Sequence, residues 1–180
     1  MRNMNILYVT PTARKLILLL LLCCSVAAFA KERYYARILP EGKMYFFMPC
    51  KLPAKAGNKL QYDMTLISYC DSVTINMTLR SPMGRVSSIS LTAGDVSYTT
   101  KQYELFFQER EGSRFNTRVH IDCPNDIYRQ LFSSPVPLTI ELTMESGAKY
   151  AFTYKAKQWQ RETVYVSEVL EMIAYSNSRK

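Results

Sequence analysis

LQYDMTLISYCDSVTINMTLR, residues 60–80, is the stretch that decides the predicted fold of this chain. Its apolar and polar residues alternate, and successive side chains of a strand point to opposite faces of a sheet. In the second half the apolar face carries Val73, Ile75, Met77 and Leu79. In the first half one face carries Leu60, Tyr62, Met64, Leu66 and Ser68. Because Tyr69-Cys70-Asp71 separates the two halves, the stretch predicts a long antiparallel hairpin with one buried face.

A hairpin with one apolar face needs a second layer to cover it, and the rest of the chain supplies further strand-like segments. Such segments are 43–48, 86–91, 103–110 and 115–122, together with a second hairpin over 137–155. The two prolines and the glycine of 49–58 predict a loop. We therefore predict a mostly β (α+β) fold: a single antiparallel β-sandwich-like domain of roughly eight strands, with a short helix and a C-terminal helix.

Both helices are predicted from side-chain spacing. After Pro124, Asn125 or Asp126 can cap a short helix, in which Tyr128 and Phe132 stand one turn apart. Near the end of the chain apolar and small side chains recur at steps of three and four, which is helical. This stripe is formed by Trp159, Thr163, Val166, Leu170 and Ile173. Three acidic residues lie off it and are expected to face solvent: Glu162, Glu168 and Glu171.

Residues 1–30 are predicted to be an export signal. Arg14 and Lys15 precede an apolar run over 16–24, and Ala28-Phe29-Ala30 ends the segment with small residues, as in a secretory signal peptide. The apolar stretch is shorter than the roughly 20 residues that a spanning helix needs. We therefore expect cleavage after residue 30, a domain over 31–180 in the periplasm or outside the cell, and no stable membrane span after cleavage.

Removal of this leader leaves 150 residues with a formal charge of +5, because three basic residues and no acidic ones leave with it. That length is typical of a single domain with its own core. The basic residues are scattered among acidic ones, which argues against a nucleic-acid partner. Weak attraction to anionic glycans or lipid headgroups is compatible with this charge, although it indicates solubility first.

Three cysteines follow the leader: Cys50, Cys70 and Cys123. An odd number in an exported protein allows one disulfide and one free thiol, or no disulfide. Cys50 and Cys70 are the pair to test first. The spacing fits no zinc site, and we expect neither a metal nor a cofactor.

The sequence assigns no catalytic residue. His120 is the only histidine, and with Arg118 and Asp122 beside it on the polar face of a strand it is predicted to be solvated surface. No nucleophile elbow, zinc motif or phosphate-binding loop occurs. An enzyme built on paired carboxylates, which have no local signature, is the third-ranked hypothesis.

Aromatic residues give the candidate ligand-binding positions, which are Tyr34, Tyr35 and Tyr150. Tyr150 shares a strand face with Phe152 and Tyr154, a pattern that favours a core over a sugar-stacking platform. Tyr34 and Tyr35 lie near the expected start of the domain, and chain ends seldom lie deep in a core.

These observations lead to the hypothesis of an exported, non-catalytic binding or envelope-structural module with a protein or glycan partner at the cell envelope. The alternative is a carrier of a small apolar ligand in a cavity capped by the C-terminal helix. An enclosed apolar cavity favours the carrier. A solid core with exposed aromatic rings favours the binding module.

Overall fold

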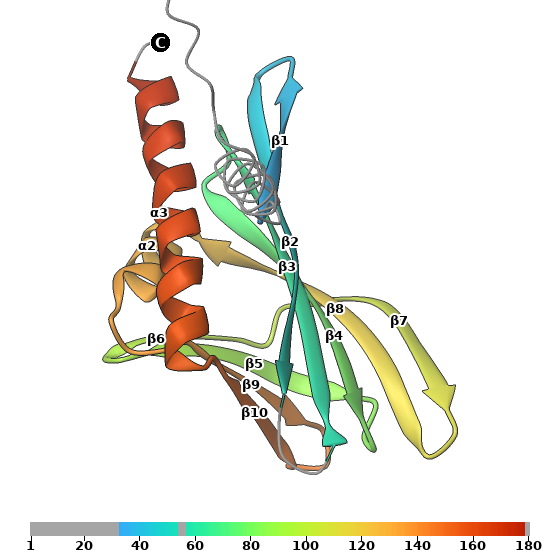
Figure 1. The fold of residues 1–180 in the computed structure, drawn as a ribbon. Coiled ribbons are helices and arrows are strands. Elements are labelled where there is room, and N and C mark those ends of the chain that lie inside the picture. Colours follow the sequence, from blue (N-terminus) through green and yellow to red (C-terminus); the bar gives the residue numbers. More distant parts are fainter. Residues whose placement is uncertain (1–32, 54–56, 179–180) are drawn as a thin grey trace, which may run out of the picture. The chain divides into compact units, whose positions relative to one another are not determined.

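The computed structural model describes residues 33–53 and 57–178, so the export signal predicted for residues 1–30 lies outside the described residues (Figure 1). The strands and helices follow one another as β1 (Tyr34–Leu39), β2 (Gly42–Pro53), β3 (Lys59–Ile67), β4 (Ser72–Ser81), β5 (Val86–Ala93), β6 (Val96–Thr100), β7 (Glu104–Glu111), β8 (Arg114–Pro124), α2 (Asn125–Ser133), β9 (Thr139–Met144), β10 (Lys149–Thr153) and α3 (Ala156–Asn177). In the described part of the chain no helix is long and apolar enough to cross a membrane.

The strands form two antiparallel sheets that pack together. Sheet A has six strands in the order β1-β2-β3-β4-β8-β7, and sheet B has four in the order β10-β9-β5-β6. The chain crosses from sheet A to sheet B after β4 and returns after β6. The predicted fold class, a mostly β sandwich-like domain with a short helix and a long C-terminal helix, is confirmed. The described residues contain ten strands instead of eight, because two further segments are strands: β1 pairs with β2, and β6 pairs with β5.

The hairpin predicted from residues 60–80 is formed by β3 and β4. Their register runs from Lys59 opposite Arg80 to Leu66 opposite Val73. The amide of Cys70 donates to the Ile67 carbonyl at 3.0 Å and helps to close the turn. Every apolar side chain assigned to the buried face of this hairpin is buried.

The loop predicted over 49–58 is wrong in its first half, because β2 continues to residue 53. The register shifts by one residue between Phe47 and Cys50, which is the signature of a β-bulge. Pro49 lies inside this bulge, and since proline has no N–H to donate to a ladder, the bulge is where a strand can hold it.

A second register shift, between Val86 and Ser88, corrects the predicted faces of β5. Strict alternation puts Val86 on the face opposite Ile89 and Leu91. The extra residue in the bulge turns Val86 back to their side, and all three are buried.

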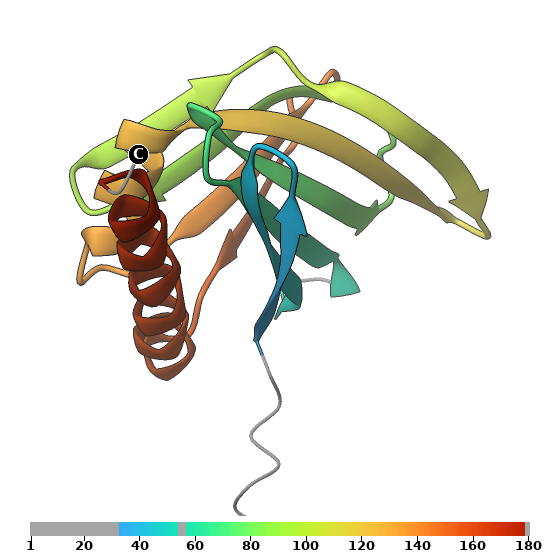
Figure 2. The ribbon, with the colours of Figure 1, turned by 90° about the horizontal axis from the view of Figure 1, so that it is seen from above.

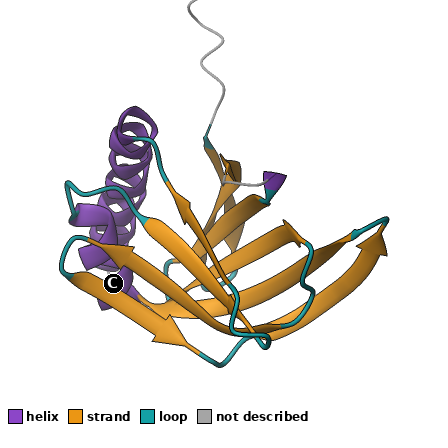
Figure 3. Ribbon diagram, turned by 90° about the horizontal axis from the view of Figure 1, so that it is seen from below, coloured by secondary structure: helices purple, strands orange, loops and turns teal. Residues whose placement is uncertain are grey.

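The core lies between the inner faces of the two sheets and extends under the helices. Sheet A contributes Tyr45, Phe47, Leu52, Leu60, Tyr62, Met64, Leu66, Val73, Ile75, Met77, Leu79, Val119 and Ile121, and sheet B contributes Val86, Ile89, Leu91, Ala93, Ile140, Leu142, Met144 and Phe152. Aromatic rings join the helices to this core, with Trp159 of α3 at 5.0 Å from Phe132 of α2 and at 5.2 Å from Tyr154, between ring centroids. Figure 3 shows both helices at one end of the strands.

The predicted cap of α2 is wrong. Pro124 occupies the N-cap position, and no side chain caps the helix. Asn125 instead donates from Nδ2 to the Cys70 carbonyl at 2.6 Å, which joins the helix start to the β3–β4 turn. The predicted contact between Tyr128 and Phe132 is present, with ring centroids 4.5 Å apart.

The predicted stripe of α3 is confirmed at Trp159, Val166 and Ile173, whereas Glu162 and Val169 are buried in place of Thr163 and Leu170. The buried residues are Trp159, Glu162, Val166, Val169 and Ile173, and Thr163 and Leu170 are only half-buried. Glu162, expected in solvent, is buried because Arg33 forms a double hydrogen bond with it: Nε to Oε2 at 2.8 Å and Nη2 to Oε1 at 2.6 Å. Burial lowers the pKa of Arg33, but the hydrogen bond and charge of Glu162 act against it, and the net pKa lies above the ordinary value.

The Arg33–Glu162 pair gives a test of this arrangement. Replacing Glu162 by alanine leaves the largely buried guanidinium without its partner, and we expect the free energy of unfolding to fall by about 3 kcal/mol. Chemical denaturation measures this change. Glu168→Ala, at an exposed position six residues further along α3, is the control and should change it by less than about 0.5 kcal/mol. Equal losses in the two variants would contradict the buried pair.

Candidate functional site

One face of sheet A packs on sheet B and the helices, and the opposite face, called the open face here, is not covered by any described element. The side chains of β4 show that the two faces differ in burial, because buried and half-exposed residues alternate along the whole strand. Figures 1 and 2 show α3 on one side of the strands and the β7–β8 hairpin extending away from it. Asp63 is the only described residue on the open face that is buried.

Polar side chains from β3, β4 and β8 lie side by side on the open face, in two hydrogen-bonded groups. This open-face cluster comprises Asp63, Thr74, Asn76, Thr78, Arg118, His120 and Asp122. Strand register explains the grouping, because Asp63, Asn76 and His120 stand directly opposite one another on the three strands. Opposite residues of paired strands share a face and lie within contact distance.

Asp63 is the centre of this cluster. Asn76 donates from Nδ2 to its Oδ1 at 2.8 Å, and Arg118 donates from Nη2 to its Oδ2 at 3.0 Å. The second guanidinium branch of Arg118 donates to Thr78 Oγ1 at 3.0 Å. A buried charge costs free energy unless it is paired and hydrogen-bonded, and here both carboxylate oxygens have donors. The cluster therefore holds its polar groups in fixed positions.

The second part of the cluster surrounds Asp122. Thr74 Oγ1 donates to Oδ1 of Asp122 at 3.1 Å, and His120 Nε2 lies 3.5 Å from Oδ2. His120 was predicted to be solvated, but its side chain is only 22 % exposed. The ring of Phe106 covers it, with centroids 5.7 Å apart.

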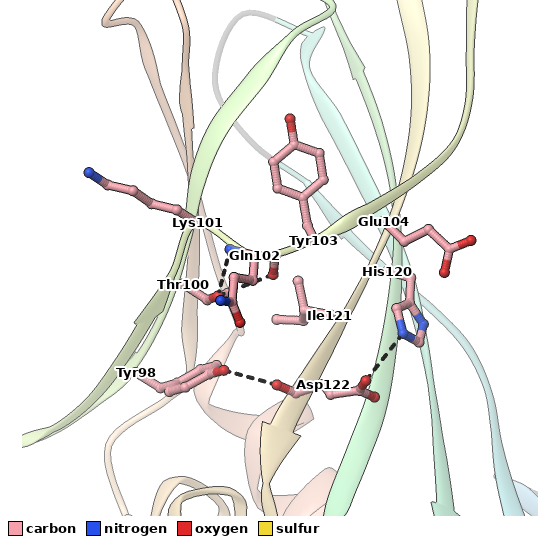
Figure 4. Close-up of a pocket in the computed structure, with 9 residues that line it drawn as sticks. All are labelled: Tyr98, Thr100, Lys101, Gln102, Tyr103, Glu104, His120, Ile121 and Asp122. Atoms are coloured by element: carbon pink, nitrogen blue, oxygen red, sulfur yellow. Dashed lines mark hydrogen bonds and ion pairs between the residues drawn. The ribbon is translucent and has the colours of Figure 1, made fainter.

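A pocket of about 510 Å³ adjoins this part of the cluster at the edge of sheet A. This edge pocket is lined by Tyr98, Thr100, Lys101, Gln102, Tyr103, Glu104, His120, Ile121 and Asp122 (Figure 4). It lies where the chain crosses from β6 to β7. Tyr98 of sheet B donates its hydroxyl to the Asp122 carbonyl at 2.9 Å, which ties the pocket wall to β8. The edge pocket and the open-face cluster share His120 and Asp122 and so form one continuous polar surface.

Exposed aromatic rings flank this surface on both sides. Tyr35 of β1 is 47 % exposed and stacks on Phe46 of β2, with ring centroids 5.1 Å apart. On the other side Phe106 and Phe107 of β7 are 47 % and 37 % exposed. Sequence reasoning missed the β7 rings, although two consecutive phenylalanines in a predicted strand must place at least one on the face away from the core.

The structure does not bring the three predicted ligand-binding tyrosines together. Tyr35 lies on the open face, whereas Tyr34 points to the other side of β1 and packs against Tyr45 and Phe47. Burial and the charge of Glu168 raise the pKa of Tyr34. Tyr150 is half-buried in sheet B, opposite Leu142. Of the three, only Tyr35 lies on the open face, with β2 between it and the open-face cluster.

The cysteines provide no reactive group on this surface. Cys50, Cys70 and Cys123 are free thiols, so the suggested Cys50–Cys70 disulfide is not present. Cys50 stands opposite Tyr62, whereas Cys70 follows the far end of β3, roughly 16 Å further along at about 3.3 Å per residue. A disulfide needs Cα atoms within about 7 Å of each other. Burial raises the pKa of Cys50, and burial together with Asp126 raises that of Cys123 to about 12.

Neither a metal centre nor a nucleophile–base pair is found among the described residues. No group of three or more His, Cys, Asp or Glu side chains there could hold a metal ion. Within that part of the chain, no hydrogen bond joins His120 to a hydroxyl or thiol side chain. The arrangement supplies fixed hydrogen-bond donors and acceptors between aromatic rings.

Comparisons with protein-family models, with curated proteins and with solved structures gave no match. The function proposed below therefore rests on the geometry of the chain itself.

The thiol environments predict a selective labelling pattern. The thiolate is the nucleophile, so a buried thiol with a pKa of about 12 reacts slowly at pH 8. We expect iodoacetamide to alkylate Cys70, in the β3–β4 turn, before Cys50 and Cys123. Peptide mapping by mass spectrometry, with and without denaturant, measures the order. Rapid alkylation of Cys123 in the native protein would contradict the described packing.

Proposed function

We propose that this protein is an exported, non-catalytic binding module that holds a glycan on the open face of sheet A. The observation that supports this proposal is the open-face cluster, an ordered polar group on an uncovered sheet between exposed aromatic rings. The envelope or extracellular location is part of the proposal and rests on the export signal predicted for residues 1–30.

The chemistry of the cluster suits a ligand rich in hydroxyl groups. Carboxylate, amide and guanidinium groups are planar and can meet two neighbouring ligand atoms at once. Asn76 and Arg118 are such groups, and their hydrogen bonds to the buried Asp63 carboxylate fix their orientation before a ligand arrives. A site that is already ordered loses less conformational entropy on binding.

The flanking rings add apolar contact area. Tyr35 with Phe46, and Phe106 with Phe107, present aromatic side chains at the two sides of the polar cluster. Aromatic side chains bury a large area at low entropic cost, and tyrosine keeps a polar tip for hydrogen bonding. A chain of sugar rings that crosses the strands can contact both ring pairs and the polar groups between them.

The cluster supports binding over catalysis. Asp63 and Asp122 both accept hydrogen bonds from neighbouring side chains, which makes them fixed acceptors. Acid–base catalysis on a glycosidic bond needs two carboxyl groups facing one bond, one of them held as an acid. In the cluster each carboxylate instead bonds to the residues beside it.

The packing under α3 gives less support to the alternative of an apolar-ligand carrier. That alternative needs a cavity between the layers beneath the helix. In the structure Trp159, Phe132, Tyr154 and Tyr62 fill this region, and their successive ring centroids are 5.0 to 6.1 Å apart. The indole N–H of Trp159 also donates to the Ser134 carbonyl at 3.0 Å, which fixes the ring in place.

Affinity electrophoresis in gels containing soluble mannan, xylan, β-glucan, dextran or dextran sulfate tests the proposal. We expect at least one polysaccharide to retard the protein. Tyr35→Ala and Phe106→Ala should each weaken that binding by about 1 kcal/mol or more, because aromatic anchors dominate such contacts. Tyr175→Ala is the matched control, since Tyr175 is 58 % exposed on α3, away from the open face, and the binding should not change.

Two outcomes would overturn this function. One is that neither open-face variant differs from the control on any polysaccharide that retards the wild-type protein. The other is release of reducing ends by the wild-type protein that His120→Ala abolishes without unfolding the domain, which would show an enzyme. If no polysaccharide retards the protein and a protein partner is retained instead, the result would favour the protein-binding version of the module.

A further inference from the structure

The open face ends in a second pocket, of about 400 Å³, at the end of the strands away from the β3–β4 turn. This basic pocket is lined by Lys51, Leu52, Lys59, Leu60, Gln61, Thr78, Arg80 and Asn116. Its polar members come from β2, β3, β4 and β8, which are neighbours in sheet A.

Strand register places the polar lining residues on the open face. Lys59, Arg80 and Asn116 stand opposite one another across three strands. Lys51 stands opposite Gln61, which in turn stands opposite Thr78. Since paired residues share a face, all six side chains lie on the same side of the sheet as the open-face cluster.

The charged side chains that line this pocket are all cationic. Its lining includes three cationic side chains and no acidic one. The Glu111 carboxylate contacts two of the lining residues, because its Oε2 lies 3.4 Å from Arg80 Nη2 and accepts a hydrogen bond from Asn116 Nδ2 at 3.0 Å, and its own side chain is 63 % exposed. Arg80 Nε is buried without a hydrogen-bond partner among the described residues. Like charges gathered on neighbouring strands repel one another unless an anion offsets them.

The basic pocket is continuous with the open-face cluster. Thr78 lines the pocket and also accepts the hydrogen bond from Arg118 Nη1 at 3.0 Å. Asn76, Thr78 and Arg80 follow one another on the same face of β4, so Asn76 of the cluster and Arg80 of the pocket are roughly 13 Å apart along the strand, at about 3.3 Å per residue. An extended ligand can occupy both.

We infer that the basic pocket binds an anionic group, a carboxylate, sulfate or phosphate, and that the glycan proposed above is therefore acidic. This inference rests on the proposed function for the identity of the ligand. The pocket supplies ammonium and guanidinium donors beside the amide of Gln61, whereas the amide of Asn116 already donates to Glu111 Oε2 at 3.0 Å. Ammonium, guanidinium and amide N–H groups are the donors that recognise oxyanions. The neutral rings of the same ligand lie on the open-face cluster.

The test compares dextran sulfate with neutral dextran, with polyglutamate as an anionic chain without sugar rings. The wild-type protein should bind dextran sulfate more tightly than dextran or polyglutamate, and more weakly as sodium chloride is added, because salt screens exposed charges. Lys59→Gln and Arg80→Gln should each weaken dextran sulfate binding about fivefold, the size of a partly exposed ion pair. Lys157→Gln, at an exposed position on α3, is the matched control and should have no effect.

The results of these binding experiments distinguish the inference from the proposed function. Circular dichroism melts first establish that the variants fold. If Tyr35→Ala weakens binding to a polysaccharide but Lys59→Gln and Arg80→Gln bind dextran sulfate as the control does, the acidic-ligand inference fails and the glycan-binding function stands. If polyglutamate binds as tightly as dextran sulfate and Tyr35→Ala changes neither, the surface binds charge alone, and both the glycan and its acidic character are refuted.

Discussion

The pairing of β3 with β4 in a single register is the constraint on which the rest of the structure depends. In this register Asp63 stands opposite Asn76, and the same pairing sets both faces of sheet A. A slip of one residue would move every core side chain of the strand to solvent. Because β8 then pairs with β4, its own two faces follow, which brings Arg118 and His120 to the open face and Val119 and Ile121 to the core. The register of these paired strands therefore determines both the core and the candidate site.

The two faces of sheet A are stabilised by different interactions. The inner face is covered by sheet B and the helices, and apolar burial is its main source of stability. No described element covers the open face, where hydrogen bonds join side chains of neighbouring strands and centre on the carboxylate of Asp63. Such a network is ordered and is also accessible to a ligand, and a pre-formed binding surface requires both properties. The exposed rings of β1 and β7 stand at the two edges of the same sheet.

The helix α3 is fixed at several places along its length. Near its start Trp159 packs on Phe132 and Tyr154, and one turn later Glu162 binds Arg33. At its end Asn177 donates from Nδ2 to the Ser68 carbonyl at 3.0 Å, beside the β3–β4 turn. These contacts cover the inner face of sheet A, and no described element covers the outer face. Position in the fold, more than residue type, thus separates a structural tyrosine such as Tyr34 from an exposed one such as Tyr35.

The sequence by itself determined the fold class, the β3–β4 hairpin with its buried face and both helices, because periodicity of apolar residues is a local property of the chain. It did not determine the bulges near Pro49 and Val86 or the burial of Glu162 in the stripe of α3, since each depends on a partner far away in the chain. The candidate site shows the same limit. Polar residues on the wet faces of β3, β4 and β8 were visible as separate alternations, but only the tertiary pairing of β4 with β8 joined Asp63 and Asn76 to Arg118 and His120. Strand pairing over long separations in sequence leaves no periodic signal, so the structure alone decided which polar residues meet.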